Sequence, residues 1–184
     1  MGRRKTIDRD EVLRLAEQLV AQNGVSALTI DSVAKAAGIT KGGVQSCFKN
    51  KEMLIDAMLK RWGKSYDESV EAIAGSDPAP MARVDAHIET TRIADQASLG
   101  KAAGLMAALI DTPDHLGWIR DWYQARLEGI DLKTEEGRRA RLAFLATEGA
   151  FFLRFFGFME IDDESWLELF SDIWSINHQA IEKP

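Results

Sequence analysis

The sequence predicts an all-α protein of about nine helices, and three observations lead to this fold class. Apolar residues recur at helical spacing along almost the whole chain. No segment of useful length alternates apolar and polar residues as a strand would. The strongest turn signals, such as the stretch from Gly75 to Pro80, stand between the apolar segments rather than within them.

The first predicted helix covers residues 9–23. Asp8 or Asp10 can cap its start, because a carboxylate accepts hydrogen bonds from the free N–H groups of the first turn. Gly24 follows its end, where a glycine commonly closes a helix. The buried side of this helix is expected to consist of Val12, Leu13, Ala16, Leu19 and Val20.

Residues 29–48 have the layout of a helix-turn-helix. Thr29 can cap a short helix that ends at Gly38, which adopts a left-handed turn without steric cost. Thr40 can cap a second short helix, which runs to about Cys47 or Phe48. One side of that second helix is apolar, and the other side is polar and slender enough to enter a DNA major groove. The polar side consists of Lys41, Gly42, Gln45, Ser46 and Lys49.

The remainder of the chain predicts a larger helical body. Asn50 can cap a long helix that ends before the turn at residues 75–80. The spacing predicts further helices over residues 81–96, 98–111, 113–129, 134–157 and 164–181. We therefore divide the chain into an N-terminal helix-turn-helix domain, residues 1–50, and a helical ligand-binding and dimerisation domain, residues 51–184. The connecting helix covers about residues 50–74.

The charge is distributed unevenly along the chain. Residues 1–62 hold 11 Lys and Arg against 7 Asp and Glu, whereas residues 63–184 hold 12 against 22, which together give the net charge of −6. A basic head on an acidic body places the positive field where DNA phosphates can bind. Chance asymmetry is the alternative for the charge alone; together with the helix-turn-helix, the pattern leads us to expect double-stranded DNA as the partner.

Several classes of protein are excluded by what the sequence lacks. It contains no nucleophile elbow, phosphate-binding loop or zinc-hydrolase motif, so we expect no enzyme and no cofactor. His87, His115 and His178 lack the spacing of metal ligands, so we expect no metal site. Cys47, the single cysteine, fits a reducing compartment. The longest apolar run, residues 102–110, is about half the length of a membrane span, so we expect a cytoplasmic protein without a membrane partner.

A pattern of apolar and small residues extends across the first four helices. It consists of Val12-Leu13, Ala16, Gly24, Leu28-Thr29, Val33-Ala34, Ala37-Gly38-Ile39, Lys41-Gly42, Phe48, Lys51-Glu52 and Leu54. In order and spacing, this pattern resembles the N-terminal domain of the TetR/AcrR family of transcription regulators over about residues 8–62, a third of the chain. The resemblance implies a DNA-binding regulator, most often a repressor.

The resemblance also implies roles for individual residues. The recognition helix would be residues 41–47, and Lys51 would hold a phosphate at the start of the long helix. Gln45 stands where the family commonly has an aromatic residue, usually tyrosine, so that aromatic contact is not carried over. The DNA-binding residues expected are Thr29, Thr40, Lys41, Gly42, Gln45, Ser46, Lys49 and Lys51.

The last two predicted helices are apolar on more than one side and therefore require cover from two directions. TetR-like proteins dimerise through their final two helices as a four-helix bundle, and this pattern is consistent with such a homodimer. A thick monomer core is the alternative. The interface residues expected are Leu142, Leu145, Phe152, Phe156, Trp166, Phe170 and Trp174.

The resemblance further implies that a small-molecule effector binds among the middle helices and releases the protein from its operator. The lining residues expected are Met106, Ile110, Trp118, Trp122 and Phe152. Aromatic walls near Asp111, Asp114, Asp121 or Glu148 would suit a cationic, flat or amphipathic ligand. Two alternatives remain: a regulator without a small-molecule inducer, and a helical ligand- or partner-binding protein whose helix-turn-helix is only a packing motif.

Overall fold

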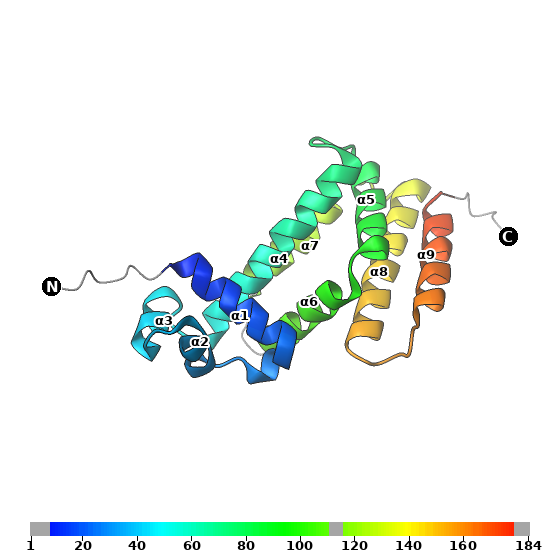
Figure 1. The fold of residues 1–184 in the computed structure, drawn as a ribbon. Helices are drawn as coiled ribbons and strands as arrows, with labels where there is room; N and C mark the ends of the chain where they lie inside the picture. The colour runs from blue at the N-terminus through cyan, green and yellow to red at the C-terminus, as the bar shows by residue number, and fades with distance from the viewer. Residues whose placement is uncertain (1–7, 111–115, 179–184) are drawn as a thin grey trace. The chain divides into compact units, whose positions relative to one another are not determined.

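The computed structural model of the protein describes residues 8–110 and 116–178, and in these residues it contains helices and no strand (Figure 1). The all-α prediction is confirmed. The expected helix starting at residue 113 and the helix end at residue 181 reach beyond the described residues. The helices are α1 (Arg9–Asn23), the short 3₁₀ helix η1 (Val25–Ala27), α2 (Ile30–Ala37), α3 (Lys41–Cys47), α4 (Lys51–Ala74), α5 (Pro80–Ile93), α6 (Gln96–Leu109), α7 (Gly117–Arg126), α8 (Glu135–Phe155) and α9 (Asp163–His178).

The described residues form two compact units. The first unit comprises residues 8–62 together with 101–110 and 116–117, and the second comprises residues 63–100 and 118–178. The helix α4 is shared, since its residues 51–62 lie in the first unit and its residues 63–74 in the second. The sequence predicts a boundary between two domains at residue 50. In the structure, residues 101–109 of α6 belong to the first unit as well.

The helix ends follow the polar residues that the sequence places there. The Asp8 carboxylate accepts from the backbone N–H of Asp10 at 2.9 Å, and the Asn50 amide oxygen accepts from the N–H of Met53 at 2.9 Å. Gly24 has a positive φ of 75° after α1. These local signals explain why the boundaries of the first helices are close to their predicted positions.

The core of the first unit joins the buried sides of α1 to α4. Val12, Val33, Val44 and Phe48 are among its residues, each at most 2% exposed. A glycine in α6 lets this helix approach η1 closely, because a Cβ at Gly104 would lie 3.2 Å from the Val25 side chain. This close packing explains why the second half of α6 belongs to the first unit.

In the second unit, α5, α8 and α9 pack against one another (Figure 1). Trp166 on α9 is 1% exposed, and its indole N–H donates to the backbone carbonyl of Arg92 on α5 at 3.1 Å. Phe170 is also 1% exposed and lies 4.5 Å from Trp166 between ring centroids. Both side chains, which the sequence analysis expects at a dimer interface, are therefore buried within a single chain. Helical spacing identified the apolar side of α9, but the side chains are covered by α5 rather than by a partner.

No helix within residues 8–110 and 116–178 combines the length and the apolar character needed to cross a bilayer.

Replacing Gly137 with Ala is expected to destabilise the second unit by about 1–3 kcal/mol or more, because it overpacks a tight helix start. A Cβ at this position would overlap the backbone oxygen of Asp131, which cannot rotate away as a side chain can. Chemical denaturation of the purified variant measures the loss. Gly100→Ala is the matched control, since its Cβ would meet Phe155 at an ordinary 3.6 Å. Equal stability of the two variants would contradict the prediction.

Candidate DNA interface, dimer surface and ligand site

The α2–turn–α3 segment has the geometry of a helix-turn-helix. Thr29 and Ser32 form a capping box, in which the Thr29 side chain accepts from the Ser32 N–H at 2.9 Å and the Ser32 side chain accepts from the Thr29 N–H at 2.9 Å. Gly38 has a left-handed φ of 63°, and the N–H of Ile39 donates to the Ala34 carbonyl at 3.1 Å across the turn. The turn is therefore short and fixed by its own hydrogen bonds.

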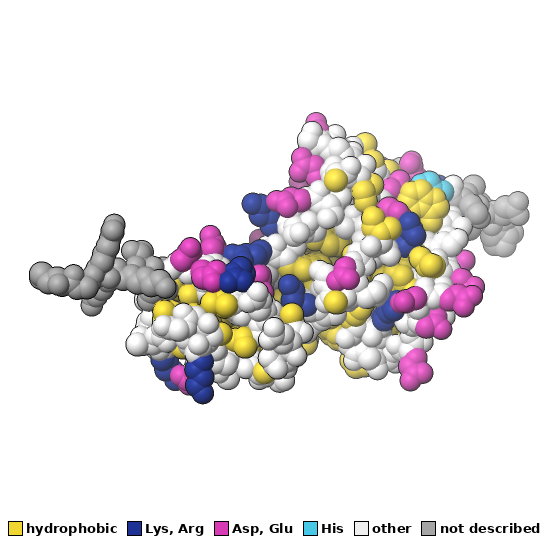
Figure 2. Space-filling model, in the orientation of Figure 1, with side chains coloured by type: hydrophobic (Ala, Val, Ile, Leu, Met, Phe, Trp, Pro, Cys, Tyr) yellow, Lys and Arg dark blue, Asp and Glu magenta, His cyan; other side chains and the backbone are white. Residues whose placement is uncertain are grey.

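The helix α3 presents a polar outer face and a buried rear. The Thr40 hydroxyl accepts from the Gly43 N–H at 3.1 Å and caps the helix. Val44 on the rear is fully buried. Among the predicted DNA-binding residues, Thr40 and the five on α3 and directly after it are exposed together: Lys41, Gly42, Gln45, Ser46 and Lys49. Figure 2 shows Lys and Arg side chains projecting from the end of this unit that α2 and α3 form, with acidic atoms between them.

Individual side chains on this face differ in how free they are to bind. Ser46 donates to the Gly43 carbonyl at 2.7 Å and is held against its own helix. Gly42 has no side chain and has space around its Cβ position, so nothing protrudes from the helix surface at this point. Gln45 is therefore the side chain on α3 best suited to reach a base edge through its amide group. Its exposure and its place on the helix agree with the expected role in base recognition.

Three of the predicted residues on or beside this face have partners within the chain. The Lys41 ammonium pairs with the Asp31 carboxylate at 3.2 Å, and both side chains are more than half exposed. Such a pair contributes little to stability, so Lys41 can exchange Asp31 for a phosphate. Lys51 is half-buried, with its ammonium 3.5 Å from the Val25 carbonyl. The Thr29 hydroxyl lies 3.1 Å from that of Ser32, inside the capping box.

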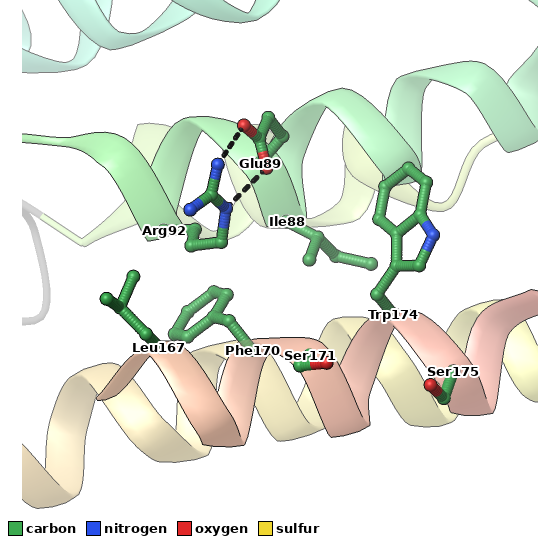
Figure 3. A pocket seen from close by; sticks show the side chains of 8 residues that line it. All are labelled: Ile88, Glu89, Arg92, Leu167, Phe170, Ser171, Trp174 and Ser175. Carbon is green, nitrogen blue, oxygen red and sulfur yellow. Dashed lines mark hydrogen bonds and ion pairs between the residues drawn. The ribbon is translucent and has the colours of Figure 1, made fainter. Parts of the chain in front are cut away.

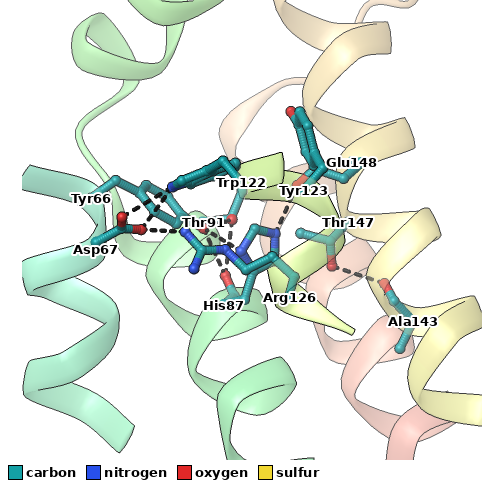
Figure 4. Close-up of polar contacts among 10 residues, drawn as sticks. All are labelled: Tyr66, Asp67, His87, Thr91, Trp122, Tyr123, Arg126, Ala143, Thr147 and Glu148. Atoms are coloured by element: carbon teal, nitrogen blue, oxygen red, sulfur yellow. Dashed lines mark hydrogen bonds and ion pairs between the residues drawn. The ribbon is translucent and has the colours of Figure 1, made fainter. Parts of the chain in front are cut away.

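A cluster of polar and aromatic side chains lies inside the second unit, contributed by α4, α5, α7 and α8 (Figure 4). On one side, Asp67 of α4 accepts from the Trp122 indole N–H at 2.9 and 3.1 Å and forms an ion pair with Arg126. The Arg126 guanidinium lies 4.0 Å from the centroid of the Trp122 ring and 6.0 Å from that of Tyr66. The Arg126 side chain is 9% exposed and that of Asp67 is 45% exposed, so a buried cation is paired with a carboxylate that reaches solvent.

On the other side of the cluster, both oxygens of Glu148 are bonded. His87 Nε2 lies 2.7 Å from one oxygen, and the Tyr123 hydroxyl donates to the other at 2.9 Å. The Tyr66 hydroxyl donates to the His87 carbonyl at 3.0 Å and lies 2.6 Å from the Thr91 hydroxyl. Burial raises the pKa of Tyr66 and of Tyr123, and the Glu148 charge raises both further. Both phenols therefore remain protonated and available as donors.

The five residues expected to line a ligand site are divided between the two units. Met106 and Ile110 belong to the first unit, whereas Trp118, Trp122 and Phe152 belong to the second. Phe152 lies between Phe151 and Phe156 on α8, with ring centroids 5.1 and 5.3 Å away. Trp122 is part of the polar cluster, and Trp118 lies against α4, where a Cβ at Gly63 would be 3.6 Å from its ring. Trp118 and Trp122 thus lie in the same unit, on the same helix, α7.

Of the acids expected beside an aromatic wall, Glu148 lies in the cluster, Asp121 is exposed, and Asp111 and Asp114 fall outside the described residues. Four members of this cluster could not be recognised from the sequence: Tyr66, Asp67, His87 and Arg126. They come from three helices, α4, α5 and α7, so no spacing along the chain indicates that these helices meet. The one local signal is the four-residue separation of Trp122 and Arg126, which places them on the same face of α7.

A surface groove of about 410 Å³ lies between α5 and α9 in the second unit (Figure 3). Ile88 and Phe170 form its buried floor, each 1% exposed. Leu167 and Trp174 are exposed on one wall, and the ion pair of Glu89 with Arg92, at 2.6 Å, lies on the other. Ser171 and Ser175 complete the lining. Figure 2 shows hydrophobic side chains reaching the surface of this unit among charged ones.

An exposed apolar stripe runs along α8. Leu142 and Leu145 are 50% and 54% exposed, and Leu153 is 38% exposed further along the helix. Phe152 and Phe156 are half-buried beside this stripe, and Trp174 on α9 is 42% exposed. Two of the expected interface residues, Leu142 and Leu145, are therefore about half exposed on α8 in the single chain.

Residues 12–58 match the bacterial regulatory proteins of the tetR family, and residues 81–175, more than half of the chain, match the tetracyclin repressor-like C-terminal domain. The HTH-type transcriptional repressor KstR2 of Mycolicibacterium smegmatis is 38% identical over 52 residues, which are 28% of this chain and 25% of that protein. The uncharacterized HTH-type transcriptional regulator YhgD of Bacillus subtilis is 39% identical over 71 residues, 36% and 37% of the two chains. The matched segments span well under two thirds of these relatives.

Solved structures share the fold of the chain. A transcriptional regulator from Rhodococcus sp. Rha1 has a TM-score of 0.67 at 21% identity, covering 92% of this chain and 95% of that one. The multidrug binding protein EbrR, solved with ethidium, has a TM-score of 0.64 at 18% identity, covering 90% and 98%. Both family matches are to regulatory proteins rather than enzymes. With a helix-turn-helix in its first unit and a matching C-terminal domain over more than half of its length, the chain belongs to the TetR family of transcription regulators.

Proposed function

We propose that the protein is a homodimeric repressor that binds an operator in double-stranded DNA and leaves it when a small molecule binds in the second unit. The observation that carries this proposal is the exposed polar face of α3, held by a buried apolar rear. That face presents Gln45 between the lysines at 41 and 49. A protein of this kind acts where the chromosome lies, in the cytoplasm.

The proposed DNA contacts divide into two kinds. Lys41, Lys49 and Lys51 contact phosphates and fix the position of the protein, with Thr29 and Thr40 at the starts of α2 and α3. Gln45 reads a base edge, and Gly42 and Ser46 allow α3 to approach the groove floor. A glutamine amide can bond adenine through two hydrogen bonds, so we expect an A·T pair at the contacted position.

The dimer is proposed to form through the apolar stripe on α8, with Leu142 and Leu145 at its centre and Phe152, Phe156 and Trp174 beside it. Apolar side chains at this exposure are typical of a surface that a partner covers. Two-fold symmetry would place two α3 helices in successive major grooves, about 34–36 Å apart.

The effector is proposed to bind at the cluster around Trp122. The helix α4 connects this cluster to the DNA-binding unit, because Tyr66 and Asp67 lie on its second half and residues 51–62 on its first. Ligand binding that moves α4 would change the spacing of the two α3 helices. A coupling of about 1–3 kcal/mol already changes operator occupancy 5- to 150-fold.

The salt dependence of binding to a random-sequence duplex tests the DNA-binding surface. Replacing Lys49 or Lys51 with Ala is expected to reduce the slope of log K against log salt by about 0.9 each, since each lysine that neutralises a phosphate releases a counterion. Fluorescence anisotropy at several salt concentrations measures this slope. Lys133→Ala, an exposed lysine of the second unit, is the control. A slope that falls equally in the control, or in none of the variants, would contradict the proposed surface.

A further inference from the structure

The polar cluster of the second unit contains an arginine in the position that a cationic ligand would prefer. The Arg126 guanidinium lies 4.0 Å from the Trp122 ring centroid and pairs with the Asp67 carboxylate, with the Tyr66 ring on a further side (Figure 4). Aromatic faces and a carboxylate are the groups that bind organic cations in proteins. Building on the proposed effector role of this site, we infer that it binds a monovalent organic cation with a flat aromatic body, and that Arg126 occupies the cation position when no ligand is bound.

The charges of the cluster favour a cation over an anion. The cluster holds two carboxylates, since Asp67 pairs with Arg126 and Glu148 bonds to His87 and Tyr123. Residues 63–184 as a whole carry 22 acidic against 12 basic residues. A site of this kind attracts positively charged molecules and repels negatively charged ones.

Arg126 is not fully satisfied in its position, which makes it a displaceable occupant. Its Nε is buried and has no hydrogen-bond partner among the residues that the structure describes. An unsatisfied buried donor costs free energy, so part of the attraction to Asp67 is offset. When a ligand cation takes over the contact with Asp67, the guanidinium can turn toward solvent and regain its hydration.

A ligand can approach this position from solvent. Asp67 is 45% exposed, and Trp118 and Trp122 are half-buried on α7. Both rings lie beside Gly63 on α4, where a Cβ would be at ordinary contact distance, 3.6 Å from Trp118 and 4.0 Å from the Trp122 nitrogen. The flat body of the ligand would stack on these rings while its charge pairs with Asp67.

Removing the Arg126 side-chain charge from the site is expected to strengthen the binding of an organic cation. In Arg126→Met, the apolar stem still packs against Trp122, but the competing charge is gone. We expect this variant to bind ethidium about tenfold more tightly than the unaltered protein, because one close charge contact corresponds to about a tenfold change. Asp67→Asn should bind ethidium at least about tenfold more weakly for the same reason.

The test is isothermal titration of the full chain with ethidium, without DNA, alongside the anionic dye anilinonaphthalene sulfonate. Arg139→Met is the matched control. Arg139 lies on α8, outside the cluster; it is 14% exposed and pairs with Glu135 at 2.7 Å. Circular dichroism verifies that each variant is folded, and Arg126→Gln serves if the methionine variant is not. Tighter ethidium binding in the Arg126 variants alone supports the inference. Unchanged or weaker ethidium binding in them, or anionic dye binding that depends on Arg126, overturns it.

The result separates this inference from the proposed function. If ethidium binds as expected but does not release DNA, the cation site is supported and its role as an effector site fails. If DNA binding is absent, the titration without DNA still decides the identity of the site.

Discussion

Replacing Leu142 and Leu145 together with Asp is expected to convert a dimer into monomers and to weaken operator binding by more than about 100-fold. The two leucines are 50% and 54% exposed in a single chain and lie about one turn apart on α8. Burying a leucine stabilises an interface by about 1.5–3 kcal/mol, and a two-fold interface buries each one twice. The variant loses these contacts and also introduces carboxylates that would be buried without partners.

Sedimentation equilibrium measures the oligomeric state of this variant, and anisotropy measures its affinity for DNA. The chain should remain folded, because both positions face solvent within one protomer. Leu132→Asp is a suitable control, since Leu132 is 40% exposed but lies outside α8. A double variant that sediments as a dimer, or an unaltered protein that sediments as a monomer, would show that this stripe is not the interface.

The second large effect is expected from Phe48→Ala. Phe48 is fully buried at the end of α3, and the Arg9 guanidinium lies 4.4 Å from its ring centroid. Truncating a buried phenylalanine to alanine costs about 3–5 kcal/mol, which is a large fraction of the stability of a small unit. The first unit should therefore unfold locally, and DNA binding should be lost with it.

Hydrogen exchange with mass spectrometry locates this effect along the chain. Exchange should become faster in α1 to α3 and remain unchanged in α8 and α9, which belong to the second unit. Met53→Ala, a 42% exposed position on α4, should have little effect. Faster exchange throughout the chain would mean that the two units do not unfold separately.

The sequence predicted the DNA-binding segment well because its signals are local. Thr29, Gly38 and Thr40 set the turn through contacts within a few residues, and all three act as expected. Helical spacing likewise revealed the apolar sides of α8 and α9. It did not reveal which of these side chains other helices cover, so Trp166 and Leu145 had the same appearance in the sequence although one is buried and the other exposed.

The polar cluster around Trp122 could not be predicted from the sequence. Asp67, His87, Arg126 and Glu148 come from four helices and meet only through tertiary packing. Their contacts are specified by how the helices cross, and helical periodicity carries no information on crossing. Met106 and Trp122, which the sequence predicts to line one site, belong to different units, since α6 is divided between the two.

Selection of duplexes from a random-sequence pool, at two salt concentrations, tests the central claim most directly. We expect enrichment of a palindrome whose half-sites lie about one helical turn apart. The affinity of the protein for this duplex should fall steeply as the salt concentration rises. Gln45→Ala should then relax the preference at one base pair of each half-site, at a cost of about 1–3 kcal/mol. A pool in which no sequence is enriched, with no binding even at low salt, would contradict the claim that this protein is a sequence-specific DNA-binding regulator.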